Sequence, residues 1–86
     1  MYKLVFTTAF DRDLKKLARG NKRLGKQIKK TIRWMYKDMN HPSLRLHKLA
    51  GENNWSVSVN REVRIIFRWE EGIVYCLRIG SHDEVY

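Results

Sequence analysis

The stretch WSVSVNREVRIIFRWEEGIVYCLRI, at residues 55–79, decides the fold of this 86-residue chain. Apolar and polar residues alternate through three runs, at 55–59, 63–69 and 73–79, and such alternation is typical of half-buried β-strands. The runs are separated only by the short segments 60–62 and 70–72, which are of hairpin length. The pattern therefore predicts three consecutive antiparallel strands with one apolar face and one polar face.

Upstream of these strands, the apolar residues recur at the spacing of helices. We expect a short opening strand around Leu4 and Phe6, followed by a helix that Thr8 caps. Gly20 is expected to end this first helix, and Asn21 to cap a second one. Each helix carries one apolar stripe: Phe10, Leu14, Leu17 and Ala18 in the first, and Leu24, Ile28, Ile32, Met35 and Met39 in the second.

These patterns together predict an α+β fold. The N-terminal strand and the helical hairpin are expected to pack on the apolar face of the antiparallel meander. The length predicts a single domain over residues 1–86, with a small core. The longest apolar run is far short of the roughly 20 residues of a membrane span, and one cysteine excludes an internal disulfide framework. We therefore expect a cytoplasmic globular protein with no membrane partner.

The charge of the chain is concentrated in its first half. The net charge is +9, and residues 1–48 alone carry 14 basic residues against three acidic ones. Such an excess points to an anionic partner, which is RNA, DNA or an acidic protein. In the second predicted helix the basic residues lie opposite the apolar stripe: Lys22, Lys26, Lys29, Lys30, Arg33 and Lys37.

Three arginines, Arg64, Arg68 and Arg78, fall on the polar face of the predicted meander. Like charges held close together repel one another unless an anion lies between them, and guanidinium groups bind phosphate through paired donors. One interpretation is therefore a groove for a phosphate chain. The alternative is that these arginines pair with nearby carboxylates, those of Glu62, Glu70, Glu71 or the C-terminus.

The three histidines, His41, His47 and His82, are on spacing alone surface residues. The sequence has no HxH or HExxH arrangement, so neither a metal site nor a cofactor is expected. A histidine near a phosphate-binding arginine nevertheless has a chemical use. RNA can be cut by its own 2′-hydroxyl if a base removes that proton, an acid protonates the leaving oxygen and a cation stabilises the phosphoryl centre.

Four segments carry a resemblance to a known family: HKLAG at 47–51, WSVSVN at 55–60, VRIIFR at 63–68 and GSHDEVY at 80–86. In this order, after a strand and two helices, they resemble the RelE/ParE superfamily of toxins from bacterial type II toxin–antitoxin modules. The similarity is greatest to the mRNA-cleaving RelE, YafQ and HigB-like branches, and it covers essentially the whole chain. It implies a RelE-like fold of the microbial-RNase type.

The resemblance also implies an activity and its partners. The expected activity is that of a metal-independent endoribonuclease that enters the empty A site of the ribosome and cuts the mRNA there, inhibiting translation. An acidic antitoxin is expected to hold the toxin inactive. Ribosomal RNA is the expected partner of the basic stripe on the second helix. The oligomeric state of the free toxin stays open.

Several residues match functional positions of the family. Arg64 matches the arginine that contacts the phosphate, His82 the general acid, Tyr86 the aromatic that stacks on the mRNA base, and His47 an active-site histidine of the YafQ branch. Further phosphate contacts are expected from Arg68, Arg78 and Lys48.

The chain departs from RelE at the catalytic base. RelE has two lysines on the strand where this sequence has Ser56 and Ser58. The base must therefore be His47, or else catalysis depends mainly on positioning and on Arg64.

Two other functions remain open at this point. The first is a ParE-like poison of DNA gyrase, which shares the fold and needs no proton-transfer residues. The second is a non-catalytic module that binds RNA or the ribosome through the same basic residues.

Overall fold

A computed structural model describes residues 2–85. It contains five strands, two long helices, one short C-terminal helix and one 3₁₀ turn, η1. In chain order the elements are β1 (Lys3–Phe6), α1 (Thr8–Ala18), α2 (Lys22–Lys37), η1 (Pro42–Leu44), β2 (His47–Lys48), β3 (Asn54–Ser58), β4 (Val63–Glu70), β5 (Ile73–Ser81) and α3 (His82–Val85).

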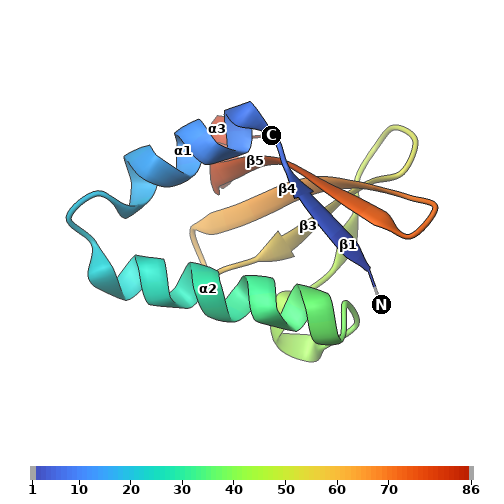
Figure 1. The fold of residues 1–86 in the computed structure, drawn as a ribbon, viewed down its shortest axis with the longest axis horizontal. Helices are drawn as coiled ribbons and strands as arrows, with labels where there is room; N and C mark the ends of the chain where they lie inside the picture. Colours follow the sequence, from blue (N-terminus) through green and yellow to red (C-terminus); the bar gives the residue numbers. More distant parts are fainter. Residues whose placement is uncertain (1, 86) are drawn as a thin grey trace.

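The strands form one mixed sheet in the order β1-β5-β4-β3-β2. The predicted antiparallel meander is confirmed as β3, β4 and β5, and β1 pairs in parallel with β5 at one edge. The two-residue strand β2, which the sequence pattern did not predict, pairs with β3 at the other edge. Figure 1 shows α1 and α2 as a hairpin of helices closed by the loop at residues 19–21.

The core forms where the helical stripes meet the apolar face of the sheet. Phe10 of α1 and Ile28 and Met35 of α2 are buried against Val57 and Phe67 of the sheet, which confirms the predicted packing. The helices within residues 2–85 are too short or too polar to span a lipid bilayer.

The start of α1 differs from the prediction. The capping residue is Thr7, whose hydroxyl oxygen accepts the backbone N–H of Phe10 at 3.1 Å, and Thr8 is the first helical residue. The same hydroxyl lies 3.1 Å from the carbonyl oxygens of both Cys76 and Leu77 in β5. The prediction that Thr8 caps the helix was wrong because a contact with a strand far away in the sequence selects Thr7.

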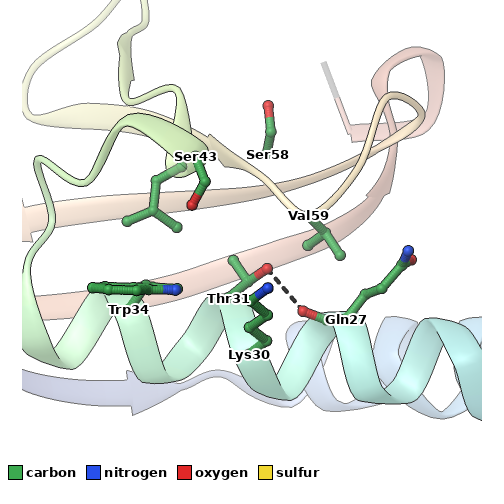
Figure 2. Close-up of a pocket in the computed structure, with 8 residues that line it drawn as sticks. Gln27, Lys30, Thr31, Trp34, Ser43, Ser58 and Val59 are labelled. Atoms are coloured by element: carbon green, nitrogen blue, oxygen red, sulfur yellow. Dashed lines mark hydrogen bonds between the residues drawn. The ribbon is translucent and has the colours of Figure 1, made fainter.

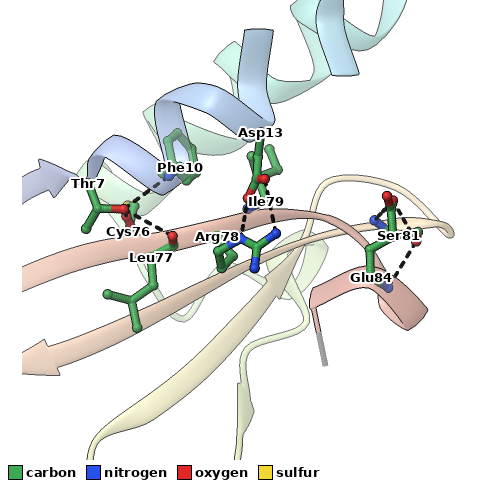
Figure 3. Close-up of polar contacts among 9 residues, drawn as sticks. All are labelled: Thr7, Phe10, Asp13, Cys76, Leu77, Arg78, Ile79, Ser81 and Glu84. Atoms are coloured by element: carbon green, nitrogen blue, oxygen red, sulfur yellow. Dashed lines mark hydrogen bonds and ion pairs between the residues drawn. The ribbon is translucent and has the colours of Figure 1, made fainter. Parts of the chain in front are cut away.

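Beyond the end of β1, side chains of α1 cover the exposed edge of β5 (Figure 3). Asp13 Oδ2 accepts the backbone N–H of Ile79 at 3.1 Å and Arg78 Nε at 2.6 Å. Burial alone would raise the pKa of Asp13. The hydrogen bonds from Arg78 and Ile79, with the charges of Arg78 and Arg12, outweigh burial and hold the pKa below its ordinary value of 3.8.

We expect Asp13→Ala to lower the free energy of unfolding by about 1–3 kcal/mol, because the Ile79 N–H and the Arg78 guanidinium lose their acceptor. Since the folded-state pKa of Asp13 is depressed, its contribution should be complete above pH 3.8 and should disappear as the pH falls through the folded-state value. Urea unfolding across this pH range measures both effects. Asp11→Ala on the same helix is the control, with a loss below about 1 kcal/mol; equal losses for the two variants would contradict the assignment.

Candidate functional site

The sheet register aligns the predicted polar residues across neighbouring strands. Ser58 of β3 and Gly80 of β5 lie on either side of Arg64 in β4. The adjacent row runs from β2 to β5 through His47, Ser56, Ile66 and Arg78. Because directly paired residues project from the same face of a sheet, these rows share one face. On it Ser56, Ile66 and Gly80 are buried, whereas His47, Ser58, Arg64 and Arg78 are at least partly exposed.

The hairpin between β3 and β4 holds one edge of the Arg64 guanidinium. Nη1 of Arg64 donates to the carbonyl oxygen of Asn60 at 2.7 Å, and the carbonyl oxygen of Arg61 lies 3.3 Å away. Within residues 2–85 no carboxylate pairs with Arg64, so its Nε and Nη2 donors remain available for an anion. The group is thus oriented by backbone oxygens while its charge is not neutralised.

The side chain of Asn60 fixes this hairpin. Its Oδ1 accepts the backbone N–H groups of Glu62 at 2.9 Å and Val63 at 2.8 Å, and its Nδ2 donates to Gln27 Oε1 of α2 at 3.0 Å. The hairpin carbonyl groups that hold Arg64 are therefore connected through one side chain to the helical layer.

A hollow of about 260 Å³ opens beside Arg64. It is lined by Arg64, Ser58 and Asn60 together with two further arginines, Arg45 and Arg61, and by no carboxylate from residues 2–85. Both additional arginines lie outside the strands: Arg61 in the hairpin and Arg45 directly after η1, with a left-handed φ of 49°. Sequence analysis did not identify them because the alternating pattern assigns a face only to strand residues.

Arg68, Arg78 and Lys48 each have a partner within the protein. Arg68 Nη2 lies 2.8 Å from Glu70 Oε1, the type of pairing that the alternative interpretation predicted. Arg78 instead pairs with Asp13 of α1, and Lys48 Nζ lies 3.3 Å from the carbonyl oxygen of Gly51. The phosphate contacts expected of these three residues remain predictions.

His82 begins α3, directly after β5. Its backbone N–H donates to the carbonyl oxygen of Glu62 at 3.2 Å, which places it at the same end of the β4–β5 pair as Arg64. Ser81 and Glu84 form a capping box around this turn, with Ser81 Oγ 2.9 Å from Glu84 Oε1 (Figure 3). The hydrogen bonds from the Ser81 side chain and backbone lower the pKa of Glu84, so the box is formed by an ionised carboxylate.

His47 is more distant from Arg64. It is exposed on β2 and pairs with Ser56, whereas Arg64 pairs with Ser58 on the other side of β3. Two strand spacings and two residues along the strand separate their Cα atoms by about 12 Å. Tyr86 lies outside the described residues.

The remaining candidate groups divide clearly by exposure. The basic residues of α2 are all exposed, which includes the five predicted to contact ribosomal RNA: Lys22, Lys26, Lys29, Lys30 and Arg33. Cys76 is buried, and burial raises the pKa of its thiol to about 12, so it remains protonated.

Among the described residues, no group of three or more His, Cys, Asp or Glu side chains is arranged to hold a metal ion.

Comparison with protein families gives a match over residues 2–86. The matching model describes YafQ, a bacterial toxin of type II toxin–antitoxin systems. The chain belongs to the YafQ toxin family. This confirms the toxin family that the resemblance indicated, whereas a comparison with curated proteins found no sequence match.

Solved structures show how far the fold of this YafQ-family chain is shared. YafQ in the Escherichia coli DinJ–YafQ complex has a TM-score of 0.82 at 14% identity, covering 100% of this chain and 99% of that one. A metal-bound toxin from Helicobacter pylori also has a TM-score of 0.82, at 21% identity and with 100% of both chains covered. A YoeB/ParE toxin from Agrobacterium tumefaciens has a TM-score of 0.78 at 23% identity, covering 93% of this chain and 98% of that one.

The contacts of Asn60 generate a prediction for this YafQ-family toxin. Asn60→Ala should lower the free energy of unfolding by about 1–3 kcal/mol, because two backbone N–H groups and Gln27 lose their partner. Gln27→Ala, which removes one hydrogen bond, should cost only about 0.5–1.5 kcal/mol. Chemical denaturation measures both values, with Asn40→Ala, an exposed residue, as the control. A neutral Asn60→Ala variant would show that the hairpin keeps its shape without this side chain.

Proposed function

We propose that this toxin is an endoribonuclease that cleaves mRNA on the ribosome. The observation that carries the proposal is the environment of Arg64, which backbone carbonyl groups orient while its charge lacks a carboxylate partner among the described residues. Arg45 and Arg61 line the same hollow, so three arginines border it and no carboxylate of residues 2–85 does. A phosphate group of RNA has the charge and the acceptor geometry that this space requires.

The proposed reaction is transfer of the phosphoryl group within the RNA. The 2′-hydroxyl oxygen attacks the adjacent phosphorus, the bond to the 5′-oxygen breaks, and a 2′,3′-cyclic phosphate and a 5′-hydroxyl end are formed. Arg64 stabilises the negative charge on the phosphoryl oxygens, and His82 donates a proton to the leaving 5′-oxygen. DNA has no 2′-hydroxyl group and is not a substrate.

We propose His47 as the general base, which accepts the proton of the 2′-hydroxyl group. About 12 Å separates the Cα atoms of His47 and Arg64 on one face of the sheet, so their side chains must extend toward each other to reach the same phosphodiester. Tyr86 is proposed to stack on a base next to the scissile bond. Arg68, Arg78 and Lys48 are proposed to contact phosphates farther along the chain, in exchange for their present partners.

The macromolecular partners follow from charge and from family membership. YafQ of Escherichia coli has been solved with the antitoxin DinJ, and a cognate acidic antitoxin is proposed here for a chain of net charge +9. Ribosomal RNA is proposed to contact the exposed basic residues of α2, on the side of that helix opposite the core.

Arg64→Ala should reduce the rate of mRNA cleavage about a hundred-fold or more, because the transition state loses its principal cation. Arg64→Lys should recover only part of the activity, since an ammonium group lacks the paired donors of guanidinium. Primer extension on mRNA from expressing cells, which maps new 5′ ends, measures the effect. Arg19→Ala removes an exposed arginine at the end of α1 and should leave cleavage unchanged.

The same experiment separates the alternative functions. Damage to DNA without new mRNA ends would indicate a gyrase poison, and intact mRNA with salt-sensitive ribosome binding would indicate a non-catalytic module. Full growth inhibition by a variant carrying both His82→Ala and Tyr86→Ala would also exclude the nuclease.

Reversing charge on α2 tests the ribosomal contact. Lys26→Glu combined with Lys29→Glu should abolish cleavage of ribosome-bound mRNA, because two attractive phosphate contacts become repulsive. The matched control is Lys15→Glu combined with Lys16→Glu, which changes the net charge equally on α1. Cosedimentation with ribosomes and primer extension measure binding and cleavage; if both pairs of substitutions have the same effect, α2 is not the specific contact.

A further inference from the structure

Gly80 lies in β5, directly opposite Arg64 of β4. Its φ is not in the left-handed region, so its backbone conformation does not require a glycine. It is buried, although it belongs to the same face of the sheet as the partly exposed Arg64. Another part of the protein must therefore cover this position.

The face on which Gly80 lies is the one opposite α2. Gly80, Arg64 and Ser58 form one row across β5, β4 and β3. Figure 2 shows the Ser58 side chain pointing away from α2, whereas the side chain of its neighbour Val59 points toward that helix. Because directly paired residues project from the same face of a sheet, the whole row lies on the side away from α2.

The short helix α3 covers Gly80 on this face. A Cβ atom at position 80 would lie 3.0 Å from Val85 Cγ1, 3.6 Å from Glu84 Oε1 and 3.7 Å from Glu84 Cβ. Carbon atoms in contact prefer separations of about 3.5–4.0 Å, so even a methyl group would be too close to Val85 by about 0.5–1 Å. A glycine is therefore required here by the space that α3 occupies.

Two further contacts hold α3 in place. Glu84 Oε1 of the capping box accepts the Ser81 hydroxyl at 2.9 Å and the Ser81 backbone N–H at 3.3 Å (Figure 3). The backbone N–H of His82 donates to the carbonyl oxygen of Glu62, in the hairpin whose other carbonyl groups hold Arg64. These bonds fix the start of α3, and the contact at Gly80 then determines how closely the helix approaches the sheet.

A methyl group at position 80 would displace α3 rather than β5. The strand lies between β1 and β4 and is hydrogen-bonded on both sides, whereas α3 is a single turn of four residues. Since His82 is the first residue of α3, a shift of this turn changes the position of its imidazole relative to a phosphate held by Arg64. A displacement of about 1 Å can reduce an enzymatic rate about a hundred-fold, because the reaction depends on the alignment of the reacting groups.

We propose that Gly80 is a positioning residue of this toxin. The absence of a side chain opposite Arg64 lets α3 lie against the sheet, and this contact sets the distance between His82 and the phosphate that Arg64 holds. The inference rests on the proposed function, in which His82 donates a proton to the leaving oxygen. It adds a residue that acts through α3 and does not touch the RNA.

Gly80→Ala should lower kcat for cleavage of ribosome-bound mRNA about ten-fold or more with little change in KM, because the contacts that bind the substrate are retained. Gly80→Val, with a larger side chain, should lower kcat further. The matched control is Gly25→Ala, since a Cβ atom there meets nothing within 4 Å beyond its own stretch of α2. This control should leave cleavage unchanged. Gly80→Ala with the wild-type kcat, or with a loss confined to KM, would overturn the proposal.

Val85→Ala tests the contact itself. This substitution removes Cγ1, the atom nearest to the added methyl group. The variant carrying both Gly80→Ala and Val85→Ala should therefore cleave about five-fold faster than Gly80→Ala alone, as expected for two residues in direct contact. If the two single reductions in rate multiply instead, the methyl group acts elsewhere, for example on Arg64, and the positioning role is wrong.

NMR of the free protein separates this inference from the nuclease proposal. In Gly80→Ala, the His82 amide and Val85 methyl signals should move while the methyl signal of the buried Met35 stays in place. Movement of α3 in a protein whose wild type cuts no mRNA would support the contact with Gly80 and contradict the nuclease. Cleavage by wild type and Gly80→Ala at the same rate would support the nuclease and overturn the positioning role.

Discussion

The side chain of Asn60 connects the fold of this toxin to its site. It accepts two backbone N–H groups of the hairpin and donates to Gln27 of α2, while the backbone carbonyl oxygen of the same residue accepts from the Arg64 guanidinium. A long side chain such as arginine loses considerable conformational freedom when it is ordered. Here the hairpin contacts order it within the protein itself, so a ligand does not have to bear the full entropic cost.

The remaining charges explain why Arg64 stands out among the arginines of the sheet. Arg78 and Arg68 form surface ion pairs with Asp13 and Glu70, whereas Arg64 has no such partner among residues 2–85. The chain has only nine acidic residues for 18 basic ones, and most basic side chains are therefore left to solvent and partners. The uncompensated charge then lies in the arginine hollow, on the outer surface of α2 and on α1.

The sequence predicted the elements whose causes are local. Alternation at 55–79 predicted the meander, the spacing of Leu24, Ile28 and Met35 predicted the buried side of α2, and Asn21 was identified as its cap. The features it did not predict depend on distant contacts. Thr7 replaces Thr8 as the cap of α1 because of carbonyl groups in β5, and the arginines at 45 and 61 join the site through loop conformations that no periodicity encodes.

The parallel pairing of β1 with β5 affects when the protein can fold during its synthesis. Thr7 and Cys76 touch although 69 residues separate them, so the first strand cannot find its place until the last strand of the sheet has been synthesised. Closing so long a loop is a late and slow event in folding. A nascent chain that has been synthesised only as far as residue 60 contains neither Arg64 nor β5, so the arginine hollow forms only after nearly the whole chain has been made.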